Sequence, residues 1–319
     1  MKRIAYCSLV KLIVTAFLFC GVESASGIVL HPDGEPNLAS WTDRPDPNIV
    51  GRWSNNASCI AVSSNCVITT QHQGGGVGTY VEIGGNTYIV TDIWNHSTAD
   101  IRVAKLYGAN LRTYVPLYTN TTERLKLIVM GGYGKGRGNP LMDGNDVYGY
   151  TWSGSNNQTQ RWGQNKINQT GTGGGNYVII ADFDGHGVLG AQPYEAAIAD
   201  WDSGSGWFIK VGDIWKIAGL SRGVEHFGES WFDPPDGMDA VRISSYAVWI
   251  SETIPEYVQG DLTDDDWVDF ADFAVLGQYW LSTECESPDW CSGADFEPDG
   301  DVDWADLAFL IDGWLNGEY

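Results

Sequence analysis

The sequence predicts a mainly β body followed by a small α-helical module. Over residues 1–259, short apolar runs alternate with turns rich in glycine and asparagine, and few stretches have the periodicity of a helix. The chain contains 40 glycines and 15 tryptophans, which also fits a turn-rich β body. Over residues 260–319, two acidic loops are each followed by an amphipathic pattern typical of a helix. With 319 residues, the chain is long enough for about two domains.

Negative charge is concentrated at the carboxy-terminal end. The chain has a formal net charge of −23, and residues 260–319 contain 17 acidic and no basic side chains. Nucleic acids are bound through Lys and Arg contacts to phosphate, so this balance argues against a nucleic-acid partner. The acidic segment is either a disordered tail or a cation-binding module, and the spacing of its carboxylates decides between them.

The segment 1–26 has the layout of a secretory signal. A basic start precedes an apolar stretch at 12–20 and small residues at 24–26. The apolar stretch is short for a membrane-spanning helix, which disfavours an uncleaved anchor. A lipoprotein signal at Cys20 is disfavoured by Phe19, where a small residue would be expected. We therefore expect an exported chain, secreted or extracellular with the periplasm and the cell surface as alternatives, that has no membrane association after signal cleavage.

Seven apolar segments of the body are predicted strands, and four of them form hairpins. In order they are 58–62 and 66–69 around the turn 63–65, 80–83 and 87–90 around the turn 84–86, then 125–130, 176–180 and 215–220. Glycines at 131–138 follow the strand 125–130. They lack the spacing of a phosphate-binding loop, so we interpret them as a turn between strands.

Three short motifs of the body contain candidate catalytic residues. His72 follows an apolar run, Asp100 opens an alternating strand, and Ser203 lies in a turn between Asp202 and Gly204. A nucleophilic serine needs a tight turn with N–H groups that face outward, a neighbouring base, and a carboxylate that orients the base. The three residues occur in the chain order His, Asp, Ser.

These motifs resemble those of the trypsin-like, chymotrypsin-fold serine proteases over about residues 48–251. In that family the histidine ends Thr-Ala-Ala-His, the aspartate opens Asp-Ile-Ala-Leu, and the serine lies in Gly-Asp-Ser-Gly-Gly-Pro. The corresponding segments here are Thr-Thr-Gln-His, Asp-Ile-Arg-Val and Trp-Asp-Ser-Gly-Ser-Gly. The resemblance implies a two-barrel β fold that hydrolyses peptide bonds of a protein or peptide substrate.

The resemblance also assigns roles to single residues. Ser203 would attack the scissile carbonyl, His72 would act as the base, and Asp100 would orient His72. The backbone N–H groups of Trp201 and Ser203 would form the oxyanion hole. No cofactor is expected for catalysis. His96, close to Asp100 in the sequence, is a rival base that the sequence leaves open.

Several positions depart from the family pattern. Trp201 replaces a glycine, Gln71 replaces a small residue, and Ala197 at the base of the specificity pocket offers no acidic anchor for Lys or Arg. In the family, a freed amino terminus pairs with the aspartate before the serine, which here is Asp202. Ile49-Val50-Gly51 is similar to such a terminus but lies too close to the histidine, which indicates a chance match. Because of Trp201, a catalytically inactive protease-fold binding protein stays a second hypothesis.

The carboxy-terminal segment contains an internal repeat, in which position 295 corresponds to position 261. Residues 261–281 and 295–315 are identical at 10 of 21 positions. Calcium is bound by about six to eight oxygens, which a loop of about 12 residues supplies at positions 1, 3, 5, 7, 9 and 12. The ligands predicted for loop one are Asp261, Thr263, Asp265, the Trp267 carbonyl, Asp269 and Asp272. Those predicted for loop two are Asp295, Glu297, Asp299, the Asp301 carbonyl, Asp303 and Asp306.

An aspartate at position 12 and the Trp-Leu ending of each helix make residues 259–316 resemble a dockerin type I domain. The resemblance implies an EF-hand-like module that binds two calcium ions and attaches to a cohesin-like scaffold protein. At positions 10 and 11, Phe270-Ala271 and Trp304-Ala305 replace the usual hydroxyl residues, so a self-contained calcium module is the alternative. A third hypothesis for the whole chain is a scaffold or adhesion component in which only this module matters.

Four cysteines remain once the signal is removed, and an even number in an exported chain indicates disulfides. The simplest pairing joins close sequence neighbours, Cys59–Cys66 and Cys285–Cys291. A zinc site is a weaker interpretation because no Cys-x-x-Cys pair is present. We predict a protease-like domain at 27–255 and a calcium-binding domain at 256–319.

Overall fold

The computed structural model describes residues 28–30, 40–152, 159–184, 189–225, 237–255, 258–263, 267–286, 290–297 and 299–316. The expected signal and the predicted ligand Asp265 lie outside the described residues. The chain is mainly β, with 40% strand and 14% helix, which confirms the predicted fold class at this level.

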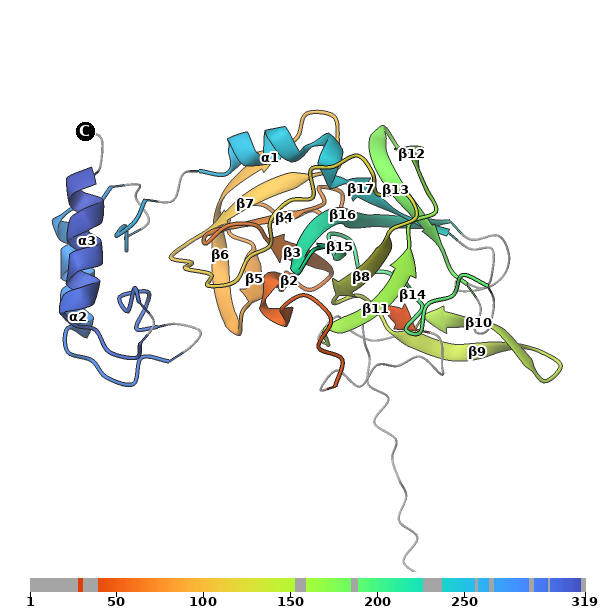
Figure 1. Ribbon diagram of the computed structural model, residues 1–319, viewed down its shortest axis with the longest axis horizontal. Helices are drawn as coiled ribbons and strands as arrows, with labels where there is room; N and C mark the ends of the chain where they lie inside the picture. The colour runs from red at the N-terminus through yellow and green to blue at the C-terminus, as the bar shows by residue number, and fades with distance from the viewer. Residues whose placement is uncertain are drawn as a thin grey trace, which may run out of the picture.

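The first lobe is a closed barrel of six strands in the order β2-β3-β4-β7-β6-β5 (Figure 1). The 3-10 turn η2 (Pro47–Ile49) leads into it, and its strands are β2 (Val50–Trp53), β3 (Ala57–Ala61), β4 (Cys66–Thr69), β5 (Tyr80–Ile83), β6 (Asn86–Asn95) and β7 (Arg102–Leu106). Both predicted hairpins are present, as β3–β4 and β5–β6. Side chains of β5 alternate between exposed and buried, whereas β3, β4 and β7 are buried at every position, as in strands covered on both faces.

The second lobe is a seven-stranded sheet in the order β11-β8-β15-β16-β17-β13-β12. In chain order its strands are β8 (Leu127–Gly132), β11 (Arg161–Lys166), β12 (Gln169–Gly173), β13 (Asn176–Asp182), β15 (Gly206–Val211), β16 (Ile214–Glu225) and β17 (Gly237–Arg242). Two further pairs join β1 (Val29–Leu30) to β14 (Ala196–Ala197) and β9 (Arg137–Asp143) to β10 (Asp146–Trp152). The resemblance implied a second barrel, but the ladder of the described strands ends at β11 and β12, so hydrogen bonds close only the first lobe.

The two lobes pack against each other through a shared core. Trp53, Ile60 and Leu106 of the barrel belong to the same buried cluster as Trp162 and Phe208 of the second sheet. The last two rings lie 5.9 Å apart between centroids. A second cluster fills the rest of the second lobe. Because interiors are close-packed, this contact fixes the lobes relative to each other and holds the loops at their junction in place.

Helices follow the last strand. The 3-10 turn η3 (Ile243–Ser245) and α1 (Ala247–Thr253) close the β body, and α2 (Phe270–Tyr279) and α3 (Trp304–Asn316) form a separate module beyond the barrel (Figure 1). The module has its own small core, which includes Val268, Leu276, Val302 and Leu310. In the described part of the chain, every helix is too short or too polar to cross a membrane.

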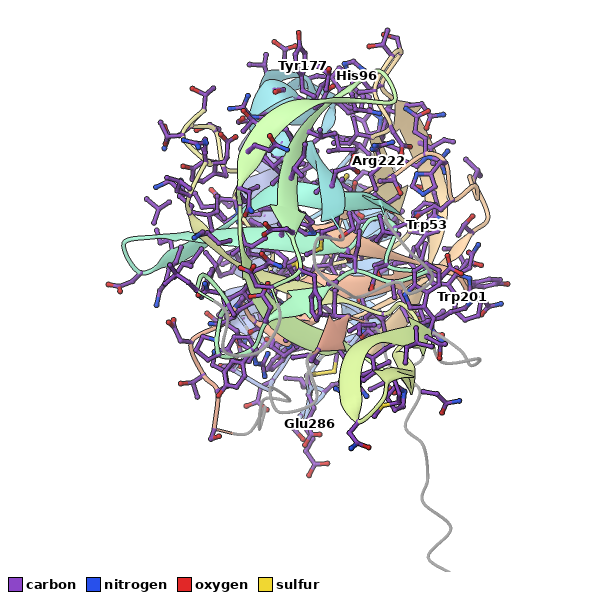
Figure 2. All side chains as sticks on the ribbon, turned by 90° about the vertical axis from the view of Figure 1, so that its right-hand side faces the viewer. Trp53, His96, Tyr177, Trp201, Arg222 and Glu286 are labelled. Atoms are coloured by element: carbon purple, nitrogen blue, oxygen red, sulfur yellow. A yellow bond between two sulfur atoms is a disulfide. The ribbon has the colours of Figure 1, made fainter. Side chains whose placement is uncertain are left out.

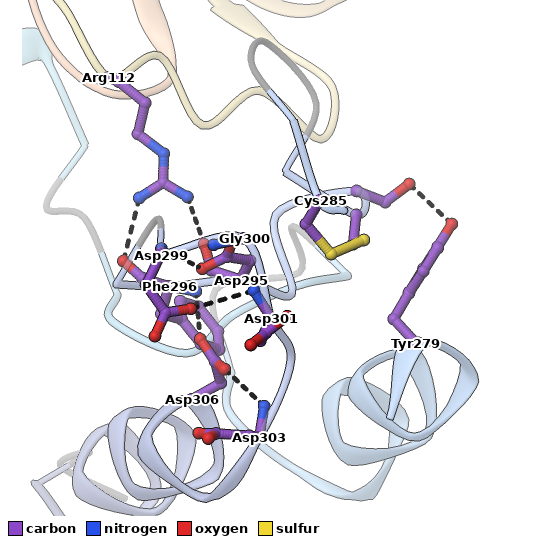
Figure 3. The surroundings of a disulfide bond; sticks show 12 residues. Arg112, Tyr279, Cys285, Asp295, Phe296, Asp299, Gly300, Asp301, Asp303 and Asp306 are labelled. Carbon is purple, nitrogen blue, oxygen red and sulfur yellow. Dashed lines mark hydrogen bonds between the residues drawn. A yellow bond between two sulfur atoms is a disulfide. The ribbon is translucent and has the colours of Figure 1, made fainter. Parts of the chain in front are cut away.

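One arginine of the β body holds the module at the barrel. The guanidinium of Arg112 donates to the backbone carbonyl oxygens of Asp295 at 2.6 Å and Phe296 at 3.0 Å (Figure 3). It also lies 5.8 Å from the ring centroid of Trp290. Both hydrogen bonds reach the backbone of the second acidic loop, so the placement of the module depends on this loop.

Of the two predicted disulfides, the structure contains one. Cys285 and Cys291 are bonded, with their Cα atoms 5.2 Å apart. The prediction for Cys59 and Cys66 is wrong, since both are buried thiols that are not joined to each other. The register of β3 and β4 gives the reason: Ile60 pairs with Ile68, so the two cysteines are offset by three positions along the hairpin. That offset is about 10 Å at the usual rise of a strand, beyond the span of a disulfide.

Candidate active site

Loops from both lobes bring His72, Asp100 and Ser203 together. His72 follows β4, Asp100 precedes β7, and Ser203 lies between β14 and β15. His72 Nδ1 is 2.5 Å from Asp100 Oδ2, and His72 Nε2 is 2.7 Å from Ser203 Oγ. The side chain of His72 is 42% exposed and that of Asp100 is 16% exposed. A substrate can therefore reach the imidazole, while the carboxylate behind it is shielded from water.

Asp100 is surrounded by donors. Its Oδ1 accepts the backbone N–H groups of Gln71 at 2.8 Å and His72 at 2.9 Å, and its Oδ2 faces the imidazole. Burial alone would raise the pKa of Asp100, but the hydrogen bonds and charge of His72 and the Gln71 N–H outweigh burial and lower it. An ionised Asp100 favours the tautomer of His72 that carries its proton on Nδ1, which leaves Nε2 able to accept a proton from Ser203.

Two amide side chains that the sequence analysis did not assign hold the loop that carries Asp100. Buried Asn176, from β13 of the second lobe, accepts the Asp100 N–H at 2.6 Å. Gln71 fastens the same loop to the end of β4 through its Nε2, which lies 2.8, 2.7 and 2.9 Å from the carbonyl oxygens of His96, Ala99 and Ile101. The departure at Gln71 therefore has a local role. No sequence motif predicts these hydrogen bonds, because the side chains of Asn176 and Gln71 bind backbone groups that only the fold brings close to them.

His96, the rival base, lies elsewhere. Its Nδ1 accepts the N–H groups of Thr98 at 3.2 Å and Ala99 at 3.0 Å. Its ring packs edge-on against Tyr246 and Trp249, with centroids 5.0 Å away in both cases. Figure 2 shows His96 at one end of the view and Trp201 well below it at the side. These contacts use His96 in packing and do not bring it to Ser203.

The turn after Ser203 requires a glycine. Gly204 has a φ of +78°, and a Cβ atom there would collide with the Thr69 hydroxyl and the Ser58 carbonyl oxygen. Two backbone hydrogen bonds anchor the turn, from Ser58 N–H to the Ser203 carbonyl at 2.8 Å and from Gly204 N–H to the Ser221 carbonyl at 3.0 Å. They attach the serine loop to the barrel on one side and to β16 on the other, which holds Ser203 opposite His72.

The two N–H groups expected to form an oxyanion hole are available. Among the described residues, neither Trp201 N–H nor Ser203 N–H has a hydrogen-bond acceptor. Trp201 has a φ of +72°, in the left-handed region that glycine favours. A residue with a side chain adopts this conformation at a cost of about 1–2 kcal/mol. Trp201 therefore has a left-handed backbone conformation that is more common for glycine. Its N–H has no acceptor within the described part of the chain.

Asp202 makes a contact with the amino-terminal segment that the sequence analysis missed. Its Oδ2 accepts the N–H groups of Ile28 at 3.0 Å and Ala199 at 2.9 Å, and its Oδ1 accepts Gly134 N–H at 2.8 Å. Complete burial raises the pKa of Asp202 to about 7, although these N–H groups act in the opposite direction. Ile28, and not Ile49, is thus the residue that faces the aspartate. The sequence signal that could have found it is Ile28-Val29, which follows the expected secretory signal after one intervening residue, Gly27.

The acidic loops repeat the same hydrogen bonds at equivalent positions of the two copies. Asp269 and Asp303 each accept the N–H group two residues further on, at 2.6 and 2.8 Å. Asp272 and Asp306 each accept the N–H group three residues before them, both at 2.8 Å, and that of the second loop residue at 2.7 and 2.6 Å. The sequence repeat is therefore also a repeat of local structure.

The remaining predicted ligands differ in their surroundings. In loop one, the Thr263 hydroxyl donates to Asp272 Oδ1 at 3.0 Å, and the side chain of Trp267 is exposed. In loop two, buried Asp295 accepts N–H groups from Asp299 at 3.3 Å and Gly300 at 3.0 Å (Figure 3). The predicted ligands that complete the set are Asp261 in loop one, and Glu297 and the carbonyl of Asp301 in loop two.

Loop two concentrates negative charge. Burial, together with the charges of Asp306 and Asp299, raises the pKa of Asp295, and the pKa of Glu297 is raised by burial and by the surrounding aspartates. Within the described residues, no three His, Cys, Asp or Glu side chains converge as ligands of one metal. The predicted donors are nevertheless all oxygens, and a divalent cation would relieve their mutual repulsion, so the donor set fits calcium.

Comparison with known proteins does not extend this picture. No protein-family model matches the chain, and no curated protein matches it. The interpretation of the site therefore depends on its geometry and on the motif resemblance.

Proposed function

We propose that the chain is an exported serine endopeptidase that uses His72, Asp100 and Ser203. The observation that carries this proposal is the line of two short contacts through the imidazole, 2.5 Å to Asp100 and 2.7 Å to Ser203. These contacts span 28 and 131 positions of the sequence. The histidine is 42% exposed, which a proton-transfer role needs and a purely structural polar cluster does not.

The residues of the site supply each part of an acyl transfer. Ser203 Oγ would attack the scissile carbonyl while His72 Nε2 takes the hydroxyl proton, and Asp100 would stabilise the imidazolium. The N–H groups of Trp201 and Ser203 would bind the oxygen that becomes negatively charged. His72 would then give the proton to the leaving amine. A water molecule, activated by the same histidine, would release the acyl group from Ser203.

Fluorophosphonate labelling of the mature chain tests this proposal. The reagent phosphonylates activated serines, so wild type is expected to be modified at Ser203 and Ser203→Ala to stay unmodified. Ser64→Ala, in the β3–β4 turn, is the matched control and should be labelled like wild type. Wild type that resists labelling under native, calcium-containing conditions would instead favour an inactive protease-fold binding protein.

We propose in addition that Ile28 is the mature amino terminus. The Ile28 nitrogen lies 3.0 Å from the buried Asp202 carboxylate. If the chain began at this residue, the nitrogen would be a positively charged amine, which stabilises a buried carboxylate far better than a neutral N–H group. The expected signal ends at residue 26, so maturation would also remove Gly27.

This proposal predicts a pH effect on stability that depends on the amino terminus. In a chain that has residues before Ile28, the pKa of Asp202 in the folded state is about 7. The unfolded chain loses the same proton near pH 4, approximately. Between these values the folded state binds more protons, so its stability should fall as pH rises, by about 4 kcal/mol in total. A chain that begins at Ile28 should lack this fall. Urea unfolding of both forms from pH 4 to 8 measures the difference, and identical profiles would contradict the assignment.

We propose that the carboxy-terminal module binds two calcium ions and attaches the enzyme to a cohesin-like scaffold. The predicted oxygens of each loop would hold one ion, which would neutralise charge that otherwise opposes folding. Exposed aromatic side chains at equivalent positions support a docking role. Phe270 is 76% and Trp304 is 73% exposed. They pack edge-on against Trp314 and Trp280, with centroids 4.9 and 5.2 Å apart.

A further inference from the structure

The side chain of Trp201 is held by a lysine from another loop. Lys135, just after β8, has its Nζ 4.8 Å from the centroid of the Trp201 ring and 6.0 Å from that of Trp152. A cation over an indole face is attracted by the negative charge of the π system. The ammonium is also paired with Asp200, the residue before Trp201, at 2.9 Å. Lys135 thus touches both Trp201 and its chain neighbour.

The backbone repeats this contact. Lys135 N–H donates to the carbonyl oxygen of Asp200 at 2.7 Å. Both the main chain and the side-chain ammonium of Lys135 therefore contact Asp200. The adjoining residue, Gly134, donates its N–H to the Asp202 carboxylate at 2.8 Å. A Cβ atom on Gly134 would collide with that carboxylate. The turn at 134–135 is therefore packed directly against residues 200–202.

A tryptophan in the left-handed region of backbone conformation needs contacts from other residues to stabilise it. Its φ of +72° is unfavourable for a bulky side chain, and persists only where surrounding contacts over-determine it. The carbonyl oxygen of the peptide between Asp200 and Trp201 accepts the main-chain N–H of Lys135. The N–H of the same peptide, on Trp201, has no partner among the described residues. A glycine would reach the same conformation without help, because it has no Cβ atom to clash.

We propose that Lys135 is a positioning residue that keeps the Trp201 N–H aimed for oxyanion binding, and that the Lys135–Trp201 pair replaces a glycine at this position. The inference rests on the proposed protease function. In this proposal the Trp201 N–H binds the oxyanion, and the indole ring serves to hold that N–H in place through its contact with the Lys135 ammonium. Lys135 acts through Trp201 and does not touch the reacting atoms.

A double-mutant cycle tests the proposal on the full chain. Lys135→Met removes the charge and keeps the length, and should lower kcat/KM for a peptide amide about 10-fold. KM should change less than about twofold, because the lost interaction is made in the transition state. Lys135→Arg should retain activity. In a Trp201→Gly background, Lys135→Met should have almost no effect. An equal loss in both backgrounds, or no loss in wild type, would overturn the assignment.

Hydrogen exchange tests the hold independently of activity. The amides of Asp202, Gly204 and Ser205 are hydrogen-bonded to the Ala199, Ser221 and Asp202 carbonyl oxygens. Lys135→Met should accelerate their exchange, and Lys135→Arg should not. Unchanged exchange in Lys135→Met would refute the hold. Accelerated exchange in a chain that no fluorophosphonate labels would show that the hold exists and that the proposed enzyme function is wrong.

Discussion

Asp100→Asn is expected to lower kcat/KM by about 10⁴-fold and leave the fold intact, which is the scale of this change in other Ser-His-Asp triads. The Asp100 carboxylate faces His72 Nδ1 at 2.5 Å and accepts two backbone N–H groups, so it is an acceptor in all three contacts. An asparagine has one acceptor oxygen and one donor amide. If the oxygen keeps the backbone bonds, the amide points at Nδ1 and forces the imidazole proton onto Nε2. His72 can then no longer accept the proton of Ser203.

The matched control for this substitution is Asp92→Asn. Asp92 is exposed on β6 of the same barrel and makes none of the contacts that hold His72, so its replacement should leave kcat/KM unchanged. Steady-state kinetics on a peptide amide and a thermal unfolding curve for each variant give the comparison. If Asp100→Asn keeps more than about a tenth of the activity, Asp100 does not orient the base.

Removing calcium is expected to unfold the carboxy-terminal module while the β body stays folded. Residues 260–319 carry 17 acidic side chains and no basic ones, and the core of the module is small. Without a cation, repulsion opposes the compact state, and binding of the two proposed calcium ions to the folded form would shift the equilibrium toward it. The β body has separate and larger cores that include no acidic loop. Its stability should therefore not depend on calcium.

Scanning calorimetry of the full chain in calcium and in chelator measures this effect. Two transitions are expected in calcium, and only that of the β body in chelator. Loop two should bind more tightly than loop one, since Gly300 adopts a φ of +99° without strain and loop one has an aspartate at that position. Asp306→Asn should accordingly weaken calcium binding more than Asp272→Asn, with Asp312→Asn on α3 as the neutral control. A module that melts at the same temperature in chelator would contradict the calcium proposal.

The sequence predicted those parts of the structure that depend on local patterns. Apolar segments on either side of short turns identified the β3–β4 and β5–β6 hairpins, and the repeat located both acidic loops. The three candidate catalytic residues were found because each lies in a short motif. Contacts between segments that are far apart in the chain have no local sequence pattern, so they could not be predicted. The Ile28 N–H meets Asp202 across 174 positions, and Asn176 meets Asp100 across 76.

The wrong disulfide has the same origin. Short spacing between Cys59 and Cys66 indicated a pair, but the register of the hairpin, set by Ile60 opposite Ile68, separates them. Register depends on which side chains fill the barrel, which is a property of all six strands together. The supporting role of Gln71 was likewise invisible, because its three acceptors are main-chain oxygens.

The contacts between Arg112 and the second acidic loop would restrict the orientation of the β body when the module is attached to a scaffold. A protease on a loose tether explores every direction within reach of its linker, and its local concentration falls steeply with distance. Two hydrogen bonds and the ring of Trp290 instead fix the module to the barrel. An enzyme attached in this way would hold His72 and Ser203 in one fixed direction relative to the scaffold. Which neighbouring proteins on the same scaffold are hydrolysed would then depend on their position relative to the enzyme, in addition to its preference for particular substrate side chains.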